Sequence, residues 1–571
     1  MSYKDLHTFM EELDHHGELK RVFTEVSSEL EITEITDRVS KSHGPALLFE
    51  NVTGSAYPVL MNAMGSYQRM SMGLGAKELD ELGSLISDYL NLGNYLSIKN
   101  LIKSIPRLLR LLYAFPSRSQ RRGKCQEVIE RNVDLDTLPV LKCWPEDAGR
   151  FITLPLVFTK DINSKRQNVG MYRLQILDKT STGMHWHKHK DGSEIYKGYQ
   201  ERGQRMPVSV ALGCDPAITY SSTAPLPPML DEMMLAGWLR KSRVKMVKCI
   251  TNDIYVPANA EIVLEGYVDP SEELVLEGPF GDHTGYYSLA DYYPRFHVTC
   301  ITHRKDAIYP ATVVGKPPME DCYMAKATER IFLPMLRMII PELVDMNLPL
   351  EGVFHNCAIV SIKSNFPGAP VKTMNAIWGM GQMMYTKLIV VVKDTVDVQD
   401  LAQVRDALLI HVNADQSLII SEGPLDALDH SSNEALYGNR LGIDATGMKT
   451  TGDNGDPSNT YEIITLKKER PGQGRDMLSE FMNLHSHKFV IAVDHEVNPA
   501  DLSTVMWKVF NNIDARRDLV IQDKKIGIDA TRKWREEGLT RDWPKDIEMS
   551  PQMKHQVDER WKDYAIDETI S

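Results

Sequence analysis

The stretch Lys387-Leu-Ile-Val-Val-Val392 recurs as Lys488-Phe-Val-Ile-Ala-Val493, and this pair decides the fold of the C-terminal part of the chain. Apolar runs rich in β-branched residues predict strands that are buried on both faces of a sheet. The same offset of 101 residues relates Leu418-Ile-Ile420 to Leu519-Val-Ile521. A pattern that keeps its register over this distance indicates a duplicated α/β unit.

The second copy of this unit is shorter than the first. Gly442-Ile-Asp-Ala-Thr446 returns as Gly527-Ile-Asp-Ala-Thr531 at an offset of only 85 residues, so the second copy lacks a loop matching residues 422–437. Chance likeness between two α/β units is the alternative, but an identical five-residue string favours duplication. Without that loop the second copy has no obvious contribution to a pocket. We expect a structural role, packing against the first copy or across a subunit interface.

Upstream of the repeat the pattern changes to strands and turns. Val208-Ser-Val-Ala-Leu212, Ile262-Val-Leu-Glu-Gly266 and residues 296–302 predict a β-rich central domain. Helical spacing at residues 5–19 and 31–39, followed by short apolar strands, is typical of an α/β opening domain. The predicted division is an N-terminal α/β domain (1–125), a central β domain (126–325), a C-terminal α/β unit (326–450) and its partial duplicate (451–571).

Residues 101–122 form a basic segment. Leucines alternate there with Lys103, Arg107, Arg110 and three further arginines, so an amphipathic helix could contact an anionic membrane surface. The favoured interpretation is a core helix that begins near Pro106, ends near Pro116 and turns a solvated basic face outward.

Composition narrows the class of function. The 78 acidic and 65 basic residues give a net charge of -13, which argues against a nucleic-acid binder and favours a small-molecule ligand. No long apolar run and no signal-peptide pattern occur, so we expect a cytoplasmic protein, with peripheral contact at the inner membrane as the alternative. The seven cysteines include no C-x-x-C pair, which predicts neither a disulfide framework nor a cysteine zinc site.

The run Glu277-Gly-Pro-Phe-Gly-Asp282-His-Thr-Gly-Tyr-Tyr287 is the most informative for chemistry. Its two carboxylates are separated by Gly-Pro-x-Gly, a bend that lets both side chains enter one pocket, as paired acid–base work requires. A turn with surface carboxylates is the alternative. Beside one arginine, two crowded carboxylates should split their pKa values, leaving one ionised and one able to donate a proton.

An arginine of the required kind stands upstream. Arg166-Gln-Asn168-Val-Gly170-Met-Tyr-Arg173 offers an amide, a flexible glycine and a guanidinium that can grip a carboxylate with two hydrogen bonds. An arginine after a strand is more often a surface residue, so this stretch alone is weak evidence for a catalytic site.

Possible metal ligands lie in two further places. His185, His187 and His189 alternate on a predicted strand, which suits either a metal site or a solvated edge. Glu232 stands at the start of a predicted helix, where it is either an ordinary first-turn acid or an oxygen ligand for Mg²⁺ or Mn²⁺.

These strings resemble the UbiD family, in particular its polyprenyl-hydroxybenzoate and menaquinone-pathway decarboxylases. The resemblance extends over nearly the whole chain, and its most specific strings are Gly44-Pro-Ala-Leu-Leu-Phe-Glu-Asn51, Cys143-Trp-Pro-Glu-Asp147, residues 168–173, residues 277–287 and Tyr385-Thr-Lys387. It implies an α/β N-terminal domain, a central split β-barrel that binds the flavin, and a C-terminal α/β domain used in oligomerisation. It also implies a carboxy-lyase that removes CO₂ from an aromatic or other unsaturated acid, with a flavin as electron sink.

The resemblance further implies cofactors, partners and residue roles. The implied cofactors are prenylated FMN, which a flavin prenyltransferase supplies, and Mn²⁺ or Mg²⁺, with K⁺ as a possible further ion. The implied substrate is an aromatic carboxylic acid, and the implied assembly is a homo-oligomer. The catalytic network corresponds to Arg173, Glu277 and Asp282, with Asp282 as proton donor. The metal ligands correspond to Asn168, His185 and Glu232. The positions expected to contact the cofactor are Asn168, Met171, Tyr172, Arg173, His185, Trp186, His187, Lys190, Asp191 and Lys387.

Two features depart from the family pattern. Members usually have Arg-Gly where this chain has Lys190-Asp191, and smaller members lack the duplicated tail. Larger menaquinone-type members share the length and Thr182-Gly-Met-His-Trp186, which favours a quinone-pathway role on a prenylated hydroxybenzoate or naphthoate. The alternatives are a decarboxylase of an unrelated aromatic or acrylic acid, a flavin- or metal-binding assembly factor without turnover, and a metal-dependent hydrolase using Glu232 and the histidines.

Overall fold

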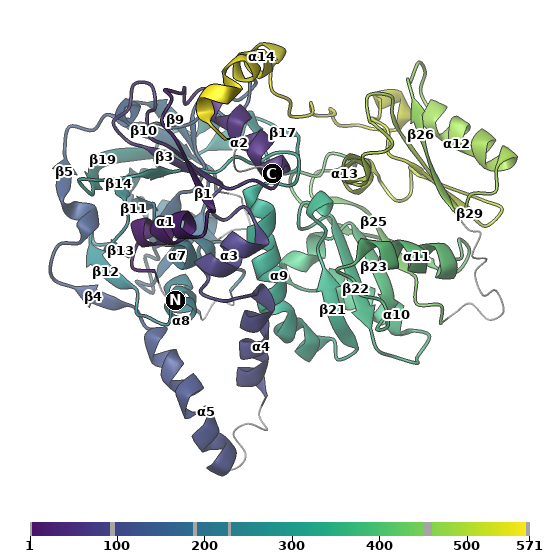
Figure 1. Ribbon diagram of the computed structural model, residues 1–571, viewed down its shortest axis with the longest axis horizontal. Helices are drawn as coiled ribbons and strands as arrows, with labels where there is room; N and C mark the ends of the chain where they lie inside the picture. The colour runs from purple at the N-terminus through teal and green to yellow at the C-terminus, as the bar shows by residue number, and fades with distance from the viewer. Residues whose placement is uncertain (1–2, 92–97, 187–190, 227–229, 449–459, 567–571) are drawn as a thin grey trace. The chain divides into compact units, whose positions relative to one another are not determined.

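The computed structural model describes residues 3–91, 98–186, 191–226, 230–448 and 460–566. The chain divides into two compact units (Figure 1). Unit 1 comprises Met1–Gly315, Met319–Thr328 and Asp546–Ser571, and unit 2 comprises Lys316–Pro318 and Glu329–Lys545. None of the helices in the described ranges is long and apolar enough to cross a membrane.

Unit 1 opens with the expected α/β domain. Its strands, in sheet order, are β1 (Leu19–Val22), β2 (Ala46–Phe49), β3 (Val59–Met61) and β20 (Tyr309–Pro310). The first helices are α1 (Leu6–His15), α2 (Glu31–Lys41) and α3 (Tyr67–Gly73). Asp5 caps α1 by accepting the Thr8 N–H, and Gly17, at φ 72°, follows its end, so both boundaries agree with the sequence.

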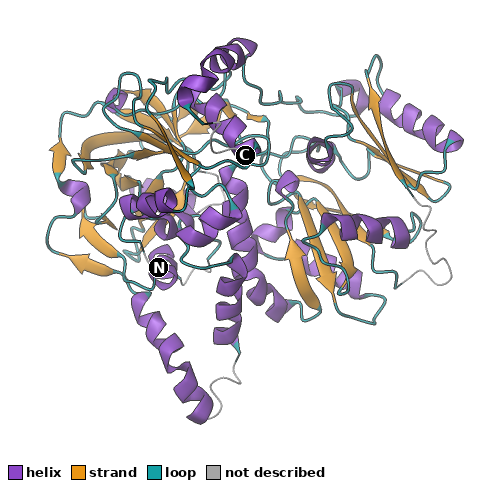
Figure 2. Cartoon of the chain, viewed as in Figure 1, coloured by secondary structure: helices purple, strands orange, loops and turns teal. Residues whose placement is uncertain are grey.

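The centre of unit 1 is a nine-stranded antiparallel sheet that forms a partial barrel, as predicted (Figure 2). Its order is β6-β9-β10-β19-β14-β11-β7-β8, and β5 pairs with β19. The bounds are β5 (Val128–Glu130), β6 (Phe151–Ile152), β7 (Leu156–Lys160), β8 (Gln167–Met171), β9 (Leu174–Asp178), β10 (Ser181–Met184), β11 (Met206–Leu212), β14 (Ile262–Val268) and β19 (Arg295–His303).

Shorter elements surround this sheet. A three-stranded sheet and two two-stranded sheets contain β4 (Ser117–Ser119), β12 (Lys245–Lys248), β13 (Tyr255–Pro257), β15 (Val275–Glu277), β16 (Phe280–Gly281), β17 (Tyr287–Ser288) and β18 (Asp291–Tyr293). The helices are α6 (Asp191–Arg202), α7 (Pro216–Ser221) and α8 (Glu232–Arg240).

The basic segment differs from its favoured interpretation. After α4 (Leu79–Leu90), the helix α5 spans Ile98–Arg110 and a 3₁₀ turn follows at Leu111–Tyr113. Ile102 and Leu109 are 60% and 52% exposed. The prediction of a core helix from near Pro106 to near Pro116 is therefore wrong, because none of the described elements of unit 1 covers these apolar side chains.

Unit 2 contains the predicted duplication. The helix α9 (Glu320–Ile339), which the unit boundary divides, continues through Pro334, and β21 (Leu343–Asn347) adds an edge strand to the first sheet. The first copy is β22 (Cys357–Ile362), α10 (Ala369–Trp378), β23 (Leu388–Lys393), α11 (Leu401–His411), β24 (Leu418–Pro424) and β25 (Tyr437–Asp444). The second is β26 (Tyr461–Leu466), α12 (Gln473–Leu484), β27 (Phe489–Asp494), α13 (Leu502–Asn512), β28 (Leu519–Gln522) and β29 (Lys525–Asp529).

The two copies have the same topology. Their sheets run β22-β23-β25-β24 and β26-β27-β29-β28, with the first three strands parallel and the last antiparallel. The missing loop is confirmed: residues 425–436 join β24 to β25, whereas only Asp523 and Lys524 join β28 to β29. Both of these residues have positive φ, 49° and 64°, as a two-residue type I′ hairpin turn requires.

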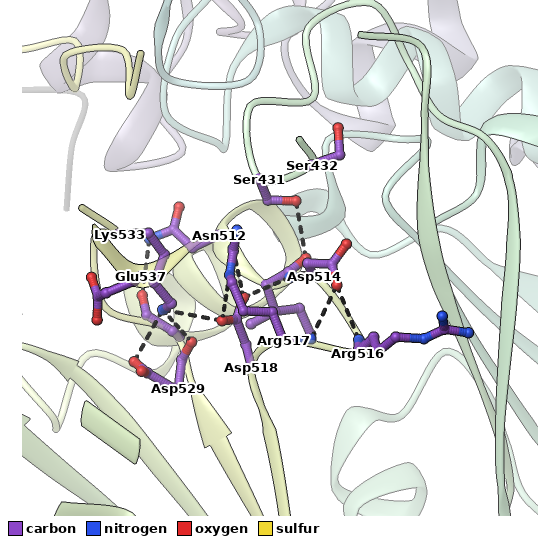
Figure 3. Close-up of polar contacts among 12 residues, drawn as sticks. Ser431, Ser432, Asn512, Asp514, Arg516, Arg517, Asp518, Asp529, Lys533 and Glu537 are labelled. Carbon is purple, nitrogen blue, oxygen red and sulfur yellow. Dashed lines mark hydrogen bonds and ion pairs between the residues drawn. The ribbon is translucent and has the colours of Figure 1, made fainter. Parts of the chain in front are cut away.

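The second copy packs against the first, which is one of the two expected arrangements. Val390 and Val392 of β23 share one hydrophobic cluster with Ile491 and Val493 of β27. A polar network holds the end of the second copy, where the Lys533 ammonium lies 3.1 Å from Asp529 and 3.7 Å from Asp518 (Figure 3).

The chain then returns to unit 1. The helix α14 (Pro551–Arg560) packs on α2, and the Tyr564 hydroxyl donates to Glu31 at 2.7 Å. Before that helix, the Ile547 N–H donates to the Gly285 carbonyl at 2.9 Å, and Asp546 forms a β-bridge with Tyr286. The tail therefore also packs on unit 1, at the loop that follows Asp282, in addition to the expected packing against the first copy.

Candidate active site

Arg173 gathers the two predicted carboxylates. It lies in the two-residue link between β8 and β9, and its Nε and Nη2 donate to Glu277 Oε1 and Oε2 at 2.8 and 3.0 Å. Its Nη1 donates to Asp282 Oδ2 at 2.5 Å, and Nη2 also reaches the Ser288 hydroxyl at 3.1 Å. The guanidinium lies over the Phe280 ring at 4.5 Å. A guanidinium that is forked onto one carboxylate and bonded through its remaining Nη1 to a second is held rigidly, and its single positive charge faces two carboxylates.

Local backbone geometry brings both carboxylates to this arginine. Glu277 ends β15, and Gly278 at φ 90° turns the chain while its N–H donates to Gln175 Oε1. At Gly281 a Cβ would lie 2.3 Å from the Trp144 ring, so only glycine fits there. The Gly-Pro-x-Gly bend thus acts as the sequence predicted.

Asp147 fixes the loop that carries Asp282. Its carboxylate accepts the N–H of Gly281 at 2.7 Å, of Trp144 at 2.9 Å and of Cys143 at 3.1 Å. Burial raises the pKa of Asp147 to about 7 despite these donors. The sequence contained this residue in Cys143-Trp-Pro-Glu-Asp147 but gave no sign that it would touch the catalytic loop.

Both candidate carboxyl groups are held in the ionised form. Burial alone would raise their pKa values, but hydrogen bonds from His185 and Arg173 lower the pKa of Glu277 to about 2. Against the same burial, the His283 hydrogen bond and the Arg173 charge hold the pKa of Asp282 well below its usual range. The expectation of one ionised carboxyl group and one able to donate a proton is therefore wrong, because each carboxylate has its own histidine in addition to the shared arginine.

His283 and Asp321 are further titratable groups at this site. His283 Nδ1 lies 2.9 Å from Asp282 Oδ1, which also accepts the His283 N–H at 2.8 Å. Asp321, in the first turn of α9, has its pKa raised to about 6 by burial, with Asp282 and His283 as charged neighbours. Neither residue was predicted from the sequence to have a role, since a histidine after an aspartate and an acid in a first helical turn are both ordinary.

His185 belongs to the same cluster. It follows β10, and its Nδ1 lies 3.0 Å from Glu277 Oε2. Its ring is 4.4 Å from that of Tyr293. Burial and the positive charge of Arg173 lower the pKa of His185, so a neutral imidazole is favoured.

Asn168 and Glu232 lie on two elements that contribute to the same apolar cluster. Asn168 is in β8 and Glu232 is the first residue of α8, while the adjacent Val169 and Met233 belong to one apolar cluster. Among the described residues, no group of three or more His, Cys, Asp and Glu side chains is arranged to hold a metal ion. An amide such as that of Asn168 is outside this set of residue types.

The remaining positions, in or just after β8 and β10, pack into two cores. Met171 packs on the cluster of Val169, and Tyr172 on the main core of unit 1. At Gly170 a Cβ would lie 2.4 Å from the Tyr172 ring, so glycine lets this ring fold back over the strand. The buried Trp186 Nε1 has no hydrogen-bond partner within the described part of the chain.

Four predicted positions are placed elsewhere or not described. His187 and Lys190 lie outside the described residues, as does His189, and only the backbone of Asp191 is described, at the start of α6. Lys387 is in unit 2, where its ammonium donates to the side chains of Asp429 and Ser431 and to the carbonyl of Asn511, at 2.8, 2.6 and 2.9 Å.

Comparison with sequence families matches most of the chain. Residues 117–317 match the Rift-related domain of 3-octaprenyl-4-hydroxybenzoate carboxy-lyase (UbiD), residues 10–86 its N-terminal domain, and residues 322–445 and 458–533 its C-terminal domain. An uncharacterised protein of Archaeoglobus fulgidus is 46% identical over 486 residues, covering 85% of this chain and 100% of its own. One from Aquifex aeolicus is 40% identical over 568 residues, 99% of each chain.

Solved structures of the same class have a similar fold. The UbiD-class enzyme HmfF from Pelotomaculum thermopropionicum, in complex with FMN, is 25% identical with a TM-score of 0.68, covering 84% of this chain and 100% of its own. Vanillic acid decarboxylase from Sedimentibacter hydroxybenzoicus, in closed form, is 26% identical with a TM-score of 0.68, covering 85% and 99%.

Proposed function

The chain belongs to the UbiD family of carboxy-lyases, and we propose that it removes CO₂ from an aromatic carboxylic acid with prenylated FMN as cofactor. The observation that carries this proposal is the buried Arg173, forked onto Glu277 and bonded through Nη1 to Asp282. A non-catalytic assembly factor has no need of a buried arginine between two carboxylates, since removing such charges from water is unfavourable.

Arg173 is proposed to orient the substrate carboxylate. Glu277 accepts from Nε and Nη2 and so fixes the guanidinium plane, whereas Asp282 takes only Nη1. An incoming carboxylate competes with Asp282 for that N–H, because both are acceptors of the same donor. Glu277 is therefore the positioning residue, and Asp282 the group that substrate displaces.

This displacement prepares Asp282 to carry a proton. Without the Arg173 hydrogen bond, and with a second carboxylate nearby, the pKa of Asp282 rises toward the range in which it binds a proton. Asp321 and His283 are neighbours that can exchange a proton with it. After CO₂ leaves, Asp282 delivers its proton to the substrate carbon.

The residues present fit the cofactor and its metal. Asn168 and Glu232 offer oxygen donors, which Mn²⁺ and Mg²⁺ prefer, and the Trp186 N–H, which no described residue accepts, suits a bound polar group. When bound, prenylated FMN supplies an electron sink for the charge left at the substrate carbon. The proposed binding positions are Asn168, Met171, Tyr172, Arg173, His185, Trp186, His187, Lys190, Asp191 and Glu232, with His185 as the third metal ligand.

Lys387 is proposed to have a different role. Its three donors already bind acceptors inside unit 2, so we assign it to the packing of the two copies rather than to the cofactor.

The proposed substrate is a prenylated hydroxybenzoate or naphthoate of a quinone pathway, handled by a homo-oligomer. The family match to a 3-octaprenyl-4-hydroxybenzoate carboxy-lyase supports the hydroxybenzoate, and the length of the chain supports the naphthoate. An unrelated aromatic acid is the alternative, since the enzyme named for vanillic acid has a similar fold.

The test is production of the protein together with a flavin prenyltransferase. We expect the released ligand to have the mass and ultraviolet spectrum of prenylated FMN, and the protein to release CO₂ from an aromatic acid. Glu232→Ala should lower both metal content and flavin occupancy, whereas Glu273→Ala, at an exposed acid of unit 1, should change neither. Turnover with metal alone would instead favour the hydrolase.

A further inference from the structure

A basic and apolar segment of unit 1 is unused by the proposed reaction. Between Asp88 and Glu127 the chain has eight basic residues and no acidic one, although its net charge is -13. The large apolar side chains that this segment exposes are Ile102, Ile105, Leu109, Leu111, Leu112, Tyr113 and Phe115. Exposed large apolar side chains that gather in one basic segment are typical of an interaction surface.

The helix α5 separates its apolar and basic positions. Ile102, Ile105 and Leu109 follow the spacing of three and four residues that defines one helix face. The basic positions 99, 103 and 107 recur every four residues and define another face. A helix of this kind lies in the plane of a membrane interface, and 13 residues, about 20 Å, are too few to span it.

The base of this surface is fixed to α8. Arg110 Nε donates to the Trp238 carbonyl at 3.0 Å and its guanidinium lies 4.4 Å from the Trp238 ring, which Tyr89 of α4 also contacts edge-on. At Gly237 a Cβ would lie 2.2 Å from the Tyr113 carbonyl, so glycine permits this close approach. Figure 1 shows α4 and α5 projecting from this base, away from the sheets of unit 1.

We propose that α5 and residues 111–115 dock on an anionic lipid bilayer. The acyl region accepts the apolar side chains, and lipid phosphates attract the basic residues, of which Arg121 and Arg122 are exposed and have no ion pair in the described ranges. A second copy of the chain is a poorer occupant, because it would bring together two segments that each contain eight basic residues and no acidic one between Asp88 and Glu127. The inference does not depend on the proposed reaction.

The experiment is co-sedimentation of the full chain with vesicles. Phosphatidylcholine vesicles containing phosphatidylglycerol should bind the protein, pure phosphatidylcholine should bind it weakly, and high salt should release it. Ile102→Glu with Leu109→Glu should abolish binding. Arg121→Gln with Arg122→Gln should weaken it by about fivefold for each charge removed.

Matched controls come from exposed residues of unit 1 outside the segment. Leu274→Glu with Leu276→Glu, and Arg131→Gln with Lys305→Gln, should leave vesicle binding unchanged. Light scattering after size-exclusion chromatography measures the oligomeric state, and so tests whether a second copy of the chain binds this surface. The proposal is overturned if the wild type does not bind anionic vesicles, if the segment variants bind like the controls, or if Ile102→Glu with Leu109→Glu changes only the oligomeric state.

Discussion

Lys387 and Lys488 occupy equivalent positions in the two copies, and each donates to the last helical turn of the other copy. Lys387 Nζ reaches the Asn511 carbonyl of α13 at 2.9 Å, and Lys488 Nζ reaches the Leu409 carbonyl of α11 at 2.6 Å. Carbonyls in a last helical turn lack partners within the helix and carry its negative end, so a lysine stabilises them. The two copies are thus joined by two equivalent hydrogen bonds, one from each lysine to the other copy.

The two lysines should nevertheless differ in their contribution to stability. Burial raises the pKa of Asp429, but the Lys387 charge helps to lower it to about 2. Lys387→Met leaves this buried carboxylate without its cation, so we expect the free energy of unfolding to fall by about 3–5 kcal/mol. Lys488→Met, at a half-buried site, should lose about 1 kcal/mol. Chemical unfolding measures both, with the exposed Lys393→Met as control. A fall in flavin occupancy without a loss of stability in Lys387→Met would restore its role as a cofactor contact.

Sequence predicted the duplication only where side chains are shared. Lys387 to Val392 and Lys488 to Val493 keep the same pattern, but Cys357–Ile362 and Tyr461–Leu466 have no identical string, so the first strand of each copy was missed. These two strands still occupy equivalent places in their sheets, because a buried strand tolerates many combinations of apolar side chains.

The residues that form the candidate site could be predicted from the sequence, but the protonation of their carboxyl groups could not. Arg173, Glu277 and Asp282 meet as expected, because the Gly-Pro-x-Gly bend fixes their approach. Their protonation depended on His185 and His283, whose contacts arise from distant or unremarkable sequence positions. The exposure of α5 was also unpredictable, since an amphipathic pattern does not say what covers its apolar face.

The ionisation of Glu277 should make the free energy of unfolding depend on pH. Its pKa falls from the ordinary 4.5 to about 2, so its ionised form is favoured by folding, and this contribution is complete above pH 4.5 and lost as the pH falls toward 2. Glu277→Gln should therefore be less stable than wild type at pH 7, by up to about 3 kcal/mol, with a difference that shrinks below pH 4.5. Thermal unfolding from pH 7 to pH 3 tests this, with Glu273→Gln as the exposed control. A difference that is constant over this range would contradict it.

Asp147 should act on turnover through the loop that it holds. Asp147→Ala removes the acceptor of three buried N–H groups, including that of Gly281 beside Asp282, and we expect turnover to fall about 100-fold as the loop shifts. Asp147→Asn keeps one acceptor oxygen, which can serve either Gly281 or the Cys143 and Trp144 pair, and should recover part of the activity. Steady-state kinetics of both variants provide the measurement; equal activity of Asp147→Ala and wild type would remove Asp147 from this role.

The C-terminal segment should support the same loop from its other side. A chain that ends at Lys545 lacks the Ile547 N–H that binds Gly285 and the bridge between Asp546 and Tyr286. We expect lower turnover with the second copy still folded, whereas deletion of residues 568–571 should have no effect. Flavin content, light scattering and CO₂ release distinguish these outcomes. Full turnover in the chain that ends at Lys545 would show that the segment only packs.

The most direct measurement is the rate of CO₂ release by Asp282→Asn loaded with prenylated FMN. The amide keeps the shape of the side chain but cannot deliver the proton, so the rate should fall by about 10²- to 10⁴-fold while flavin occupancy stays at the wild-type level. Asp291→Asn, at an exposed aspartate of the neighbouring β18, should keep wild-type rate and occupancy. A near-normal rate in Asp282→Asn with full flavin occupancy would contradict the assignment of Asp282 as proton donor and, with it, the proposed chemistry of the Arg173 cluster.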